Sequence, residues 1–202
     1  MYFFLLSYPI LGAGLKYIDD AFDATIFNKR IAMILAPLLG ALWAYTMIID
    51  QISATILLAI LLGVLLKGKI DNYAHFIGLT VILGIVFATG MQFLIFPLIL
   101  LTVAALFDEV GNDFIDKKHY LNSPKRWHKI TGYFFDQRWL TKVAILGIVF
   151  VGIFPFYYFA AMLLFDGAYL FVHWYSETKR REPGIVKDER ALCSDPILHM
   201  ER

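Results

Sequence analysis

The sequence predicts an all-α membrane protein, a multi-pass transmembrane helical bundle of about seven helices. Hydrophobic residues make up 59% of the 202 residues and charged residues 17%, whereas soluble domains have about 45–50% and about 25%. The hydrophobic residues form long runs, and Lys and Arg lie only between alternate runs. These features exclude an ordinary soluble enzyme and a disordered chain. The net charge of +1 gives no reason to expect a nucleic-acid partner, and the lone cysteine, Cys193, cannot form an intramolecular disulfide.

The apolar runs in the first half of the chain predict five helices. Residues 2–15 form the first run, and no Lys or Arg precedes it as in a signal peptide, so we expect a retained helix. Residues 31–49 and 52–66 form the next two runs. The charge-free range 76–107 is too long for one crossing, which takes about 20 residues. It therefore predicts a hairpin of two helices that turns near Gly90.

Two further helices are expected in the second half of the chain. Residues 143–165 and 167–175 form a long apolar block, which we expect to turn near Pro155. The total is then seven crossings. Residues 1–176 are expected to form the bundle, and residues 177–202 a polar cytoplasmic tail.

The distribution of Lys and Arg predicts the orientation of the bundle. With seven crossings, all 18 Lys and Arg residues fall on one side, in the segments 16–30, 67–75, 108–142 and 176–202. Cytoplasmic loops are enriched in these residues. We therefore expect the N-terminus outside and the C-terminus in the cytoplasm, with any site in these segments at the cytoplasmic face.

Acidic residues gather on the same side in two clusters, each directly after an expected helix. The first cluster contains Asp19, Asp20 and Asp23, and the second contains Asp108, Glu109, Asp113 and Asp116 together with Asn112. Residues three or four apart share a helix face, so several carboxylates of each cluster should lie together. Such a set suits Mg²⁺, which bridges one or two carboxylates to substrate phosphates. Basic residues that could neutralise a diphosphate follow the clusters: Lys29, Arg30, Lys117, Lys118 and Arg126. The alternative is that the acidic residues are solvated anchors at helix ends.

The segment Asp19-Asp20-Ala21-Phe22-Asp23 is a DDxxD string, and its context resembles the UbiA superfamily of intramembrane prenyltransferases. That family has nine helices, a cytoplasmic N-terminus and two Asp-rich motifs on cytoplasmic loops after its second and sixth helices. The present chain is similar to this layout without the first and last helices. Asp19 stands where the family usually has Asn, a further Asp of the first motif falls on Phe27, and Asn112 takes the middle place of the second motif.

The resemblance implies magnesium-dependent transfer of a prenyl group from a prenyl diphosphate to a membrane-soluble acceptor, a lipid or an aromatic compound. It implies catalytic and metal-binding roles for the two motifs. The catalytic residues would be Asp19, Asp20, Asp23, Asp108, Asn112 and Asp116, and the metal ligands would be the acidic members of both clusters, with Glu109 and Asp113 as substitutes. The departures at Phe27 and Asn112 leave open a non-catalytic membrane subunit with the same fold.

Other readings of the sequence stay open. A small transporter or channel would need charged residues near the middle of the bilayer, where Asp166 is the single candidate, and we expect this residue to face the bundle and to bond a tyrosine or His173. The loop 67–75 is either a solvated connector or a phosphate-binding segment. Segment 123–129 mixes basic and aromatic residues, as in segments that rest on the anionic inner leaflet. A layout short of two helices would expose bundle surface, so a homo-oligomer is a further possibility.

Overall fold

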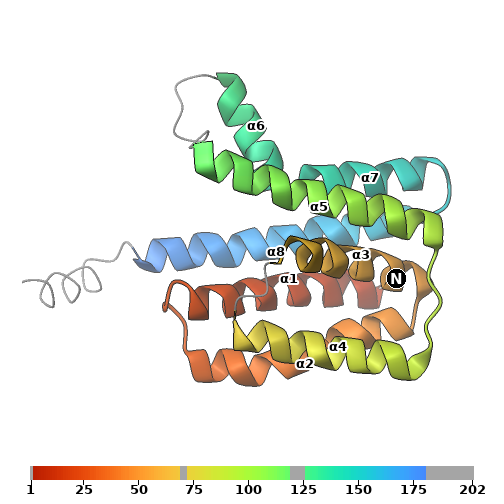
Figure 1. Cartoon of the computed structure of the whole chain (residues 1–202), viewed down its shortest axis with the longest axis horizontal. Helices are drawn as coiled ribbons and strands as arrows, with labels where there is room; N and C mark the ends of the chain where they lie inside the picture. The colour runs from red at the N-terminus through yellow and green to blue at the C-terminus, as the bar shows by residue number, and fades with distance from the viewer. Residues whose placement is uncertain (1, 69–71, 119–125, 181–202) are drawn as a thin grey trace, which may run out of the picture.

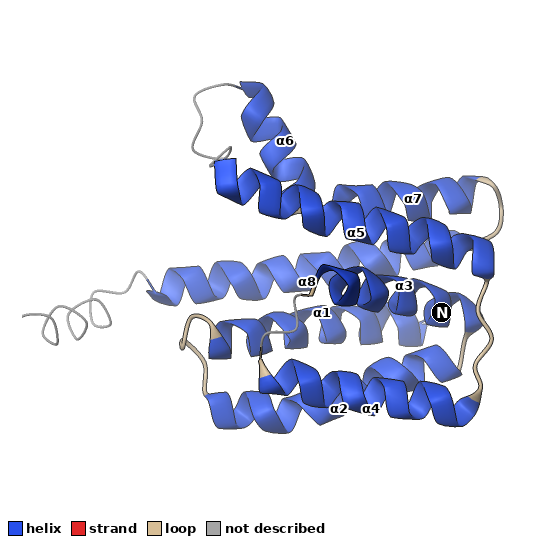
Figure 2. Ribbon diagram, viewed as in Figure 1, coloured by secondary structure: helices blue, strands red, loops and turns tan. Residues whose placement is uncertain are grey.

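The computed structural model describes residues 2–68, 72–118 and 126–180, and these residues form helices joined by turns and loops, without a strand (Figures 1 and 2). The all-α prediction is confirmed. The described parts contain the following helices: α1 (Tyr2–Phe22), α2 (Lys29–Ile48), α3 (Gln51–Lys67), α4 (Tyr73–Thr89), α5 (Ile95–Lys118), α6 (Arg126–Asp136), α7 (Trp139–Phe150) and α8 (Phe156–Arg180). Helix α6 lies in a segment where the sequence predicts no helix.

Short polar side chains and glycines set the ends of the helices in the first half of the chain. Asn28, Asp50 and Asn72 precede α2, α3 and α4, and each side chain accepts a hydrogen bond from a backbone N–H of the first turn. Such caps satisfy donors that have no partner within the helix. Helices α3 and α4 end at Gly68 and Gly90, which have the positive φ angles of 73° and 58° that favour glycine. The predicted turn near Gly90 is thus the α4–α5 connection.

Most residues of the two acidic clusters are helical, and Asp23 lies in the turn directly after α1. Helix α1 continues beyond the apolar run to Phe22 and includes Asp19 and Asp20. Helix α5 continues to Lys118 and contains the whole second cluster. Charged residues at these places extend the helices because their backbone groups still bond within the helix. The clusters therefore present fixed faces instead of mobile loops.

The closest helix pairs are α1 with α8, α3 with α5 and α2 with α4. A Cβ atom added to Gly12 would lie 2.1 Å from the carbonyl oxygen of Phe165, so α1 and α8 touch backbone to backbone. A Cβ atom on Gly40 would lie 2.7 Å from the carbonyl oxygen of Gly78, which makes the α2–α4 contact similar. Small residues allow such close approach between helices in membranes.

Within the described ranges, three helices are long and apolar enough to cross a membrane: Lys29–Ile48, Ile95–Ile115 and Phe156–Arg180. Helices α3, α4 and α7 are shorter apolar helices. Large side chains such as Phe87 and Phe150, each 82% exposed, project from the bundle. The seven crossings and their orientation remain predictions. Figure 1 shows the α1–α2 connection and the C-terminal ends of α5 and α8 at the same end of the molecule.

Candidate functional site

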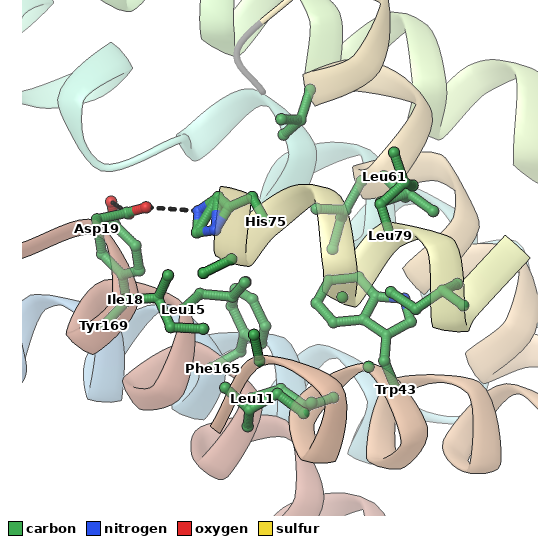
Figure 3. Close-up of a pocket in the computed structure, with 18 of the residues that line it drawn as sticks. Leu11, Leu15, Ile18, Asp19, Trp43, Leu61, His75, Leu79, Phe165 and Tyr169 are labelled. Atoms are coloured by element: carbon green, nitrogen blue, oxygen red, sulfur yellow. Dashed lines mark hydrogen bonds and ion pairs between the residues drawn. The ribbon is translucent and has the colours of Figure 1, made fainter. Parts of the chain in front are cut away.

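A cavity of about 360 Å³ lies between α1, α2, α3, α4, α5 and α8. This volume is within the range of about 300–1,000 Å³ for small-molecule sites. Its apolar wall comes from five helices and includes the following residues: Leu11, Leu15, Ile18, Leu39, Trp43, Ile60, Leu61, Val64, Leu79, Ile82 and Phe165. Figure 3 shows Asp19 and His75 on one side of the cavity and Trp43 on the other.

The polar end of the cavity brings both predicted clusters together. Asp19 of α1 and Asp23 just after α1 line it, and Glu109 and Asn112 of α5 line it as well. Helical spacing explains why these members of each cluster line the cavity together, because residues three or four apart share a face. His75, Arg138 and Tyr169 complete this end, which we call the polar mouth.

Asp19 is the most connected carboxylate of the polar mouth. Its Oδ1 lies 2.6 Å from Nε2 of His75, and its Oδ2 accepts a hydrogen bond of 3.1 Å from the hydroxyl of Tyr169. Burial raises the pKa of the Asp19 carboxyl above its ordinary value, although the neighbouring His75 and Lys16 act in the opposite direction. A cation that bound Asp19 would have to compete with these partners.

Glu109 and Arg138 form the second ion pair of the polar mouth, with 2.9 Å between Oε1 and Nη2. Arg138 immediately precedes α7 and has a left-handed backbone, φ 51° and ψ 47°. Burial lowers the pKa of its guanidinium, but Glu109 and then Tyr169 and Asp166 raise it by more, so the group stays charged. Non-glycine residues in this region are held there by their surroundings and are frequent at functional sites.

Three acidic residues of the predicted motifs lie outside the cavity and have other partners. Asp20 is buried and lies 3.0 Å from Nζ of Lys16. Asp113 lies 2.5 Å from Nζ of Lys67. Asp108 is directed at the start of α7, where it accepts hydrogen bonds from the backbone N–H groups of Leu140 and Thr141 and from the Thr141 hydroxyl. Asp108 is therefore the capping group of α7.

The basic residues predicted to bind diphosphate are exposed and do not line the cavity: Lys29, Arg30, Lys117, Lys118 and Arg126. Lys29 and Lys118 lie over the rings of Phe22 and Phe114. The side chain of Asp116, residues 69–71 of the polar loop, residues 123–125 of segment 123–129 and residues 181–202 of the predicted tail lie outside the described residues.

The sequence analysis missed Arg138 and Tyr169. Arg138 stands directly before the apolar residues of α7, and Tyr169 follows the inward-facing Phe165 by four residues. This spacing puts both α8 side chains on one helix face. The partner of Asp166 was also predicted wrongly. It is Lys142, whose Nζ lies 2.7 Å from Oδ2, and His173 is exposed.

The donor atoms of the polar mouth fit Mg²⁺ by their chemistry. Oδ1 of Asn112 is buried and has no hydrogen-bond partner among the described residues. Carboxylate oxygens of Asp19, Asp23 and Glu109 line the same cavity. Within the described parts of the chain, no three His, Cys, Asp or Glu side chains are close enough to hold a metal ion by themselves. Mg²⁺ usually takes only one or two carboxylates and completes its shell with waters and substrate phosphates.

The chain was compared with protein-family models, with curated proteins and with solved structures. None of them gives a significant match.

Proposed function

We propose that the protein transfers a prenyl group from a prenyl diphosphate to a membrane-soluble acceptor, at the cytoplasmic face of the membrane and with Mg²⁺. One observation carries the proposal. Two acidic segments of α1 and α5, far apart in the sequence, contribute to a single polar mouth above an apolar cavity. This combination suits a ligand with a charged head and a hydrocarbon tail.

Residues of the polar mouth would bind the diphosphate, and residues of the apolar wall would bind the tail. Asp19, Asp23, Glu109 and Asn112 would hold Mg²⁺, which when bound neutralises charge on the departing diphosphate. Arg138 places positive charge at the same end, and the imidazole of His75 lies beside Asp19. Side chains of the apolar wall would hold the tail and exclude water from the allylic cation.

The reaction would break the bond between the allylic carbon and the diphosphate oxygen. The acceptor would supply the electron pair for the new bond to this carbon and would then lose a proton. Groups aimed at the developing charge are the main source of catalysis in such sites. The positive charge of Arg138, fixed by Glu109, is suited to this task.

The proposal is tested by calorimetric binding of geranyl thiodiphosphate, a slowly reacting analogue, to the purified full chain with and without Mg²⁺. We expect binding to depend on Mg²⁺. The variant Asp23→Asn should weaken it about 10- to 100-fold, as loss of a supporting group at a metal site does. Asp23 is exposed, so the variant should fold.

The matched control is Glu177→Gln on α8, a carboxylate outside the cavity. It should leave the affinity unchanged. Binding that ignores both Mg²⁺ and Asp23→Asn would rule out a magnesium–diphosphate site in the polar mouth.

The ion pairs of the polar mouth favour a second candidate, a non-catalytic membrane subunit that binds a lipid. Asp19 already contacts His75, and Glu109 already has a cationic partner in Arg138. Under this second candidate the chain would bind tailed ligands without Mg²⁺ and would form no prenylated product.

A further inference from the structure

The depth of the cavity can be derived from the helix register. On α1 the lining residues run from Asp23 and Asp19 at the polar mouth to Leu11. Eight residues separate Asp19 from Leu11, and a helix rises about 1.5 Å per residue, so the apolar part is about 12 Å deep. On α4 the lining residues likewise run from the polar mouth, at His75, to the deep part of the cavity, at Ile82.

Trp43 closes the deep end of the cavity. It is the lining residue of α2 farthest from the polar mouth and is only 4% exposed. Its ring packs edge-on against Phe165, with 6.2 Å between the ring centroids and 81° between the planes. Leu11 and Phe165, which line the same cavity, are fully buried. Figure 3 shows Trp43 across the cavity from Asp19 and His75.

The Trp43 ring is held in place by packing, without a hydrogen bond to any described residue. The indole N–H is buried and has no hydrogen-bond partner among the described residues. Replacement by Phe therefore removes no described hydrogen bond and keeps an aromatic ring against Phe165. Replacement by Ala removes the floor of the cavity.

In an extended chain each bond adds about 1.2 Å, because an extended residue has three backbone bonds and spans about 3.6 Å. An isoprene unit adds four chain bonds and therefore about 5 Å on the same basis. A depth of about 12 Å holds two such units and is too short for three.

We infer that Trp43 limits the ligand tail to the length of a geranyl group, so that the indole is the specificity-determining residue of the cavity. The inference rests on the proposed function for its choice of a prenyl tail. It goes beyond that function because it selects short donors over long ones.

The test compares geranyl, farnesyl and geranylgeranyl thiodiphosphates on the full-length protein in detergent with Mg²⁺. For the unchanged protein, affinity should fall about tenfold or more from geranyl to farnesyl, since single methylenes already change discrimination by about that factor in closed pockets. Trp43→Ala should remove this fall, and Trp43→Phe should keep most of it. Equal binding of all three tails by the unchanged protein would overturn the inference.

Two further variants protect the test against a folding defect. Trp174→Ala is the matched control, because Trp174 is 62% exposed and lies outside the cavity. It should leave the tail preference unchanged. Leu79→Phe adds bulk one turn below His75 and should weaken geranyl binding at least about fivefold while dimethylallyl thiodiphosphate is unaffected. An unchanged geranyl affinity in Leu79→Phe would contradict the proposed position of the tail.

Geraniol, farnesol and geranylgeraniol separate this inference from the proposed function, because they carry the tails without the diphosphate. A length limit among the alcohols that Trp43→Ala removes would support the inference even if no diphosphate binds. Diphosphate binding that needs Mg²⁺ but shows no length limit would overturn the inference and leave the proposed function standing.

Discussion

The ion pair between Lys142 of α7 and Asp166 of α8 should be a strong determinant of stability. Nζ and Oδ2 are 2.7 Å apart, and the side chains are 4% and 9% exposed. Removing one partner of a buried pair leaves an uncompensated charge and costs about 3–5 kcal/mol. For a chain of this size, each kcal/mol shifts the melting temperature by about 2–4 °C. The variant Lys142→Met should therefore melt about 6–20 °C lower, and Asp166→Leu should show a loss of the same order.

The double variant Lys142→Met with Asp166→Leu decides whether the pair itself is responsible. Replacement of both partners by apolar residues is often neutral or stabilising, so the double variant should melt above either single variant. Thermal unfolding of the purified proteins, followed by intrinsic fluorescence, measures the three shifts. Lys29→Met, at an exposed position, is the control and should change little. If the losses of the single variants simply add in the double variant, the two side chains do not act as a pair.

Three more predictions follow from contacts described above. Gly12→Ala should cost about 1–3 kcal/mol of unfolding free energy by overpacking. Gly84→Ala has nothing within 4 Å of the added Cβ and should stabilise α4 by about 0.5–1 kcal/mol. Equal effects of the two variants in denaturant titrations would contradict the α1–α8 contact. Asp108→Ala should cost about 0.5–2 kcal/mol through loss of the α7 cap, and Asp108→Asn should recover part of this loss because its amide oxygen can still accept from Thr141. Because burial raises the pKa of Asp19, its folded pKa exceeds its unfolded one. The stability linked to its proton is present below the unfolded pKa and is lost as pH rises through the folded pKa. As pH rises through the folded pKa, the melting temperature of the unchanged protein should therefore fall relative to that of Asp19→Asn. A constant difference between the two melting temperatures across this pH range would contradict the raised pKa.

The sequence predicts the positions of most helices because apolar runs and caps are local features. The turn predicted near Gly90 is the end of α4 in the structure. The alternating helix directions predict both acidic clusters on one side of the bundle, and residues of both clusters line one cavity.

Partners across helices could not be predicted in the same way. Several cationic residues lie near each acidic residue in the expected topology, and only packing decides that Asp113 pairs with Lys67 and Glu109 with Arg138. Helix α6 escaped prediction because its 11 residues mix basic and aromatic side chains and contain no long apolar run. The capping role of Asp108 depends on the contact between α5 and α7, which no periodicity reveals.

The contact between α1 and α8 has a consequence for biosynthesis. These helices are the first and last of the described chain, and roughly 130 residues separate them. The end of α8 lies about 160 residues after the end of α1. At about 5–20 residues per second, α8 is completed about 8–32 s after α1. During that time the α1 surface around Gly12 has no α8 to pack against, and Asp19 lacks the hydrogen bond from Tyr169. The face of α1 that contacts α8 is therefore uncovered until α8 has been made, and a chain truncated before α8 leaves it uncovered.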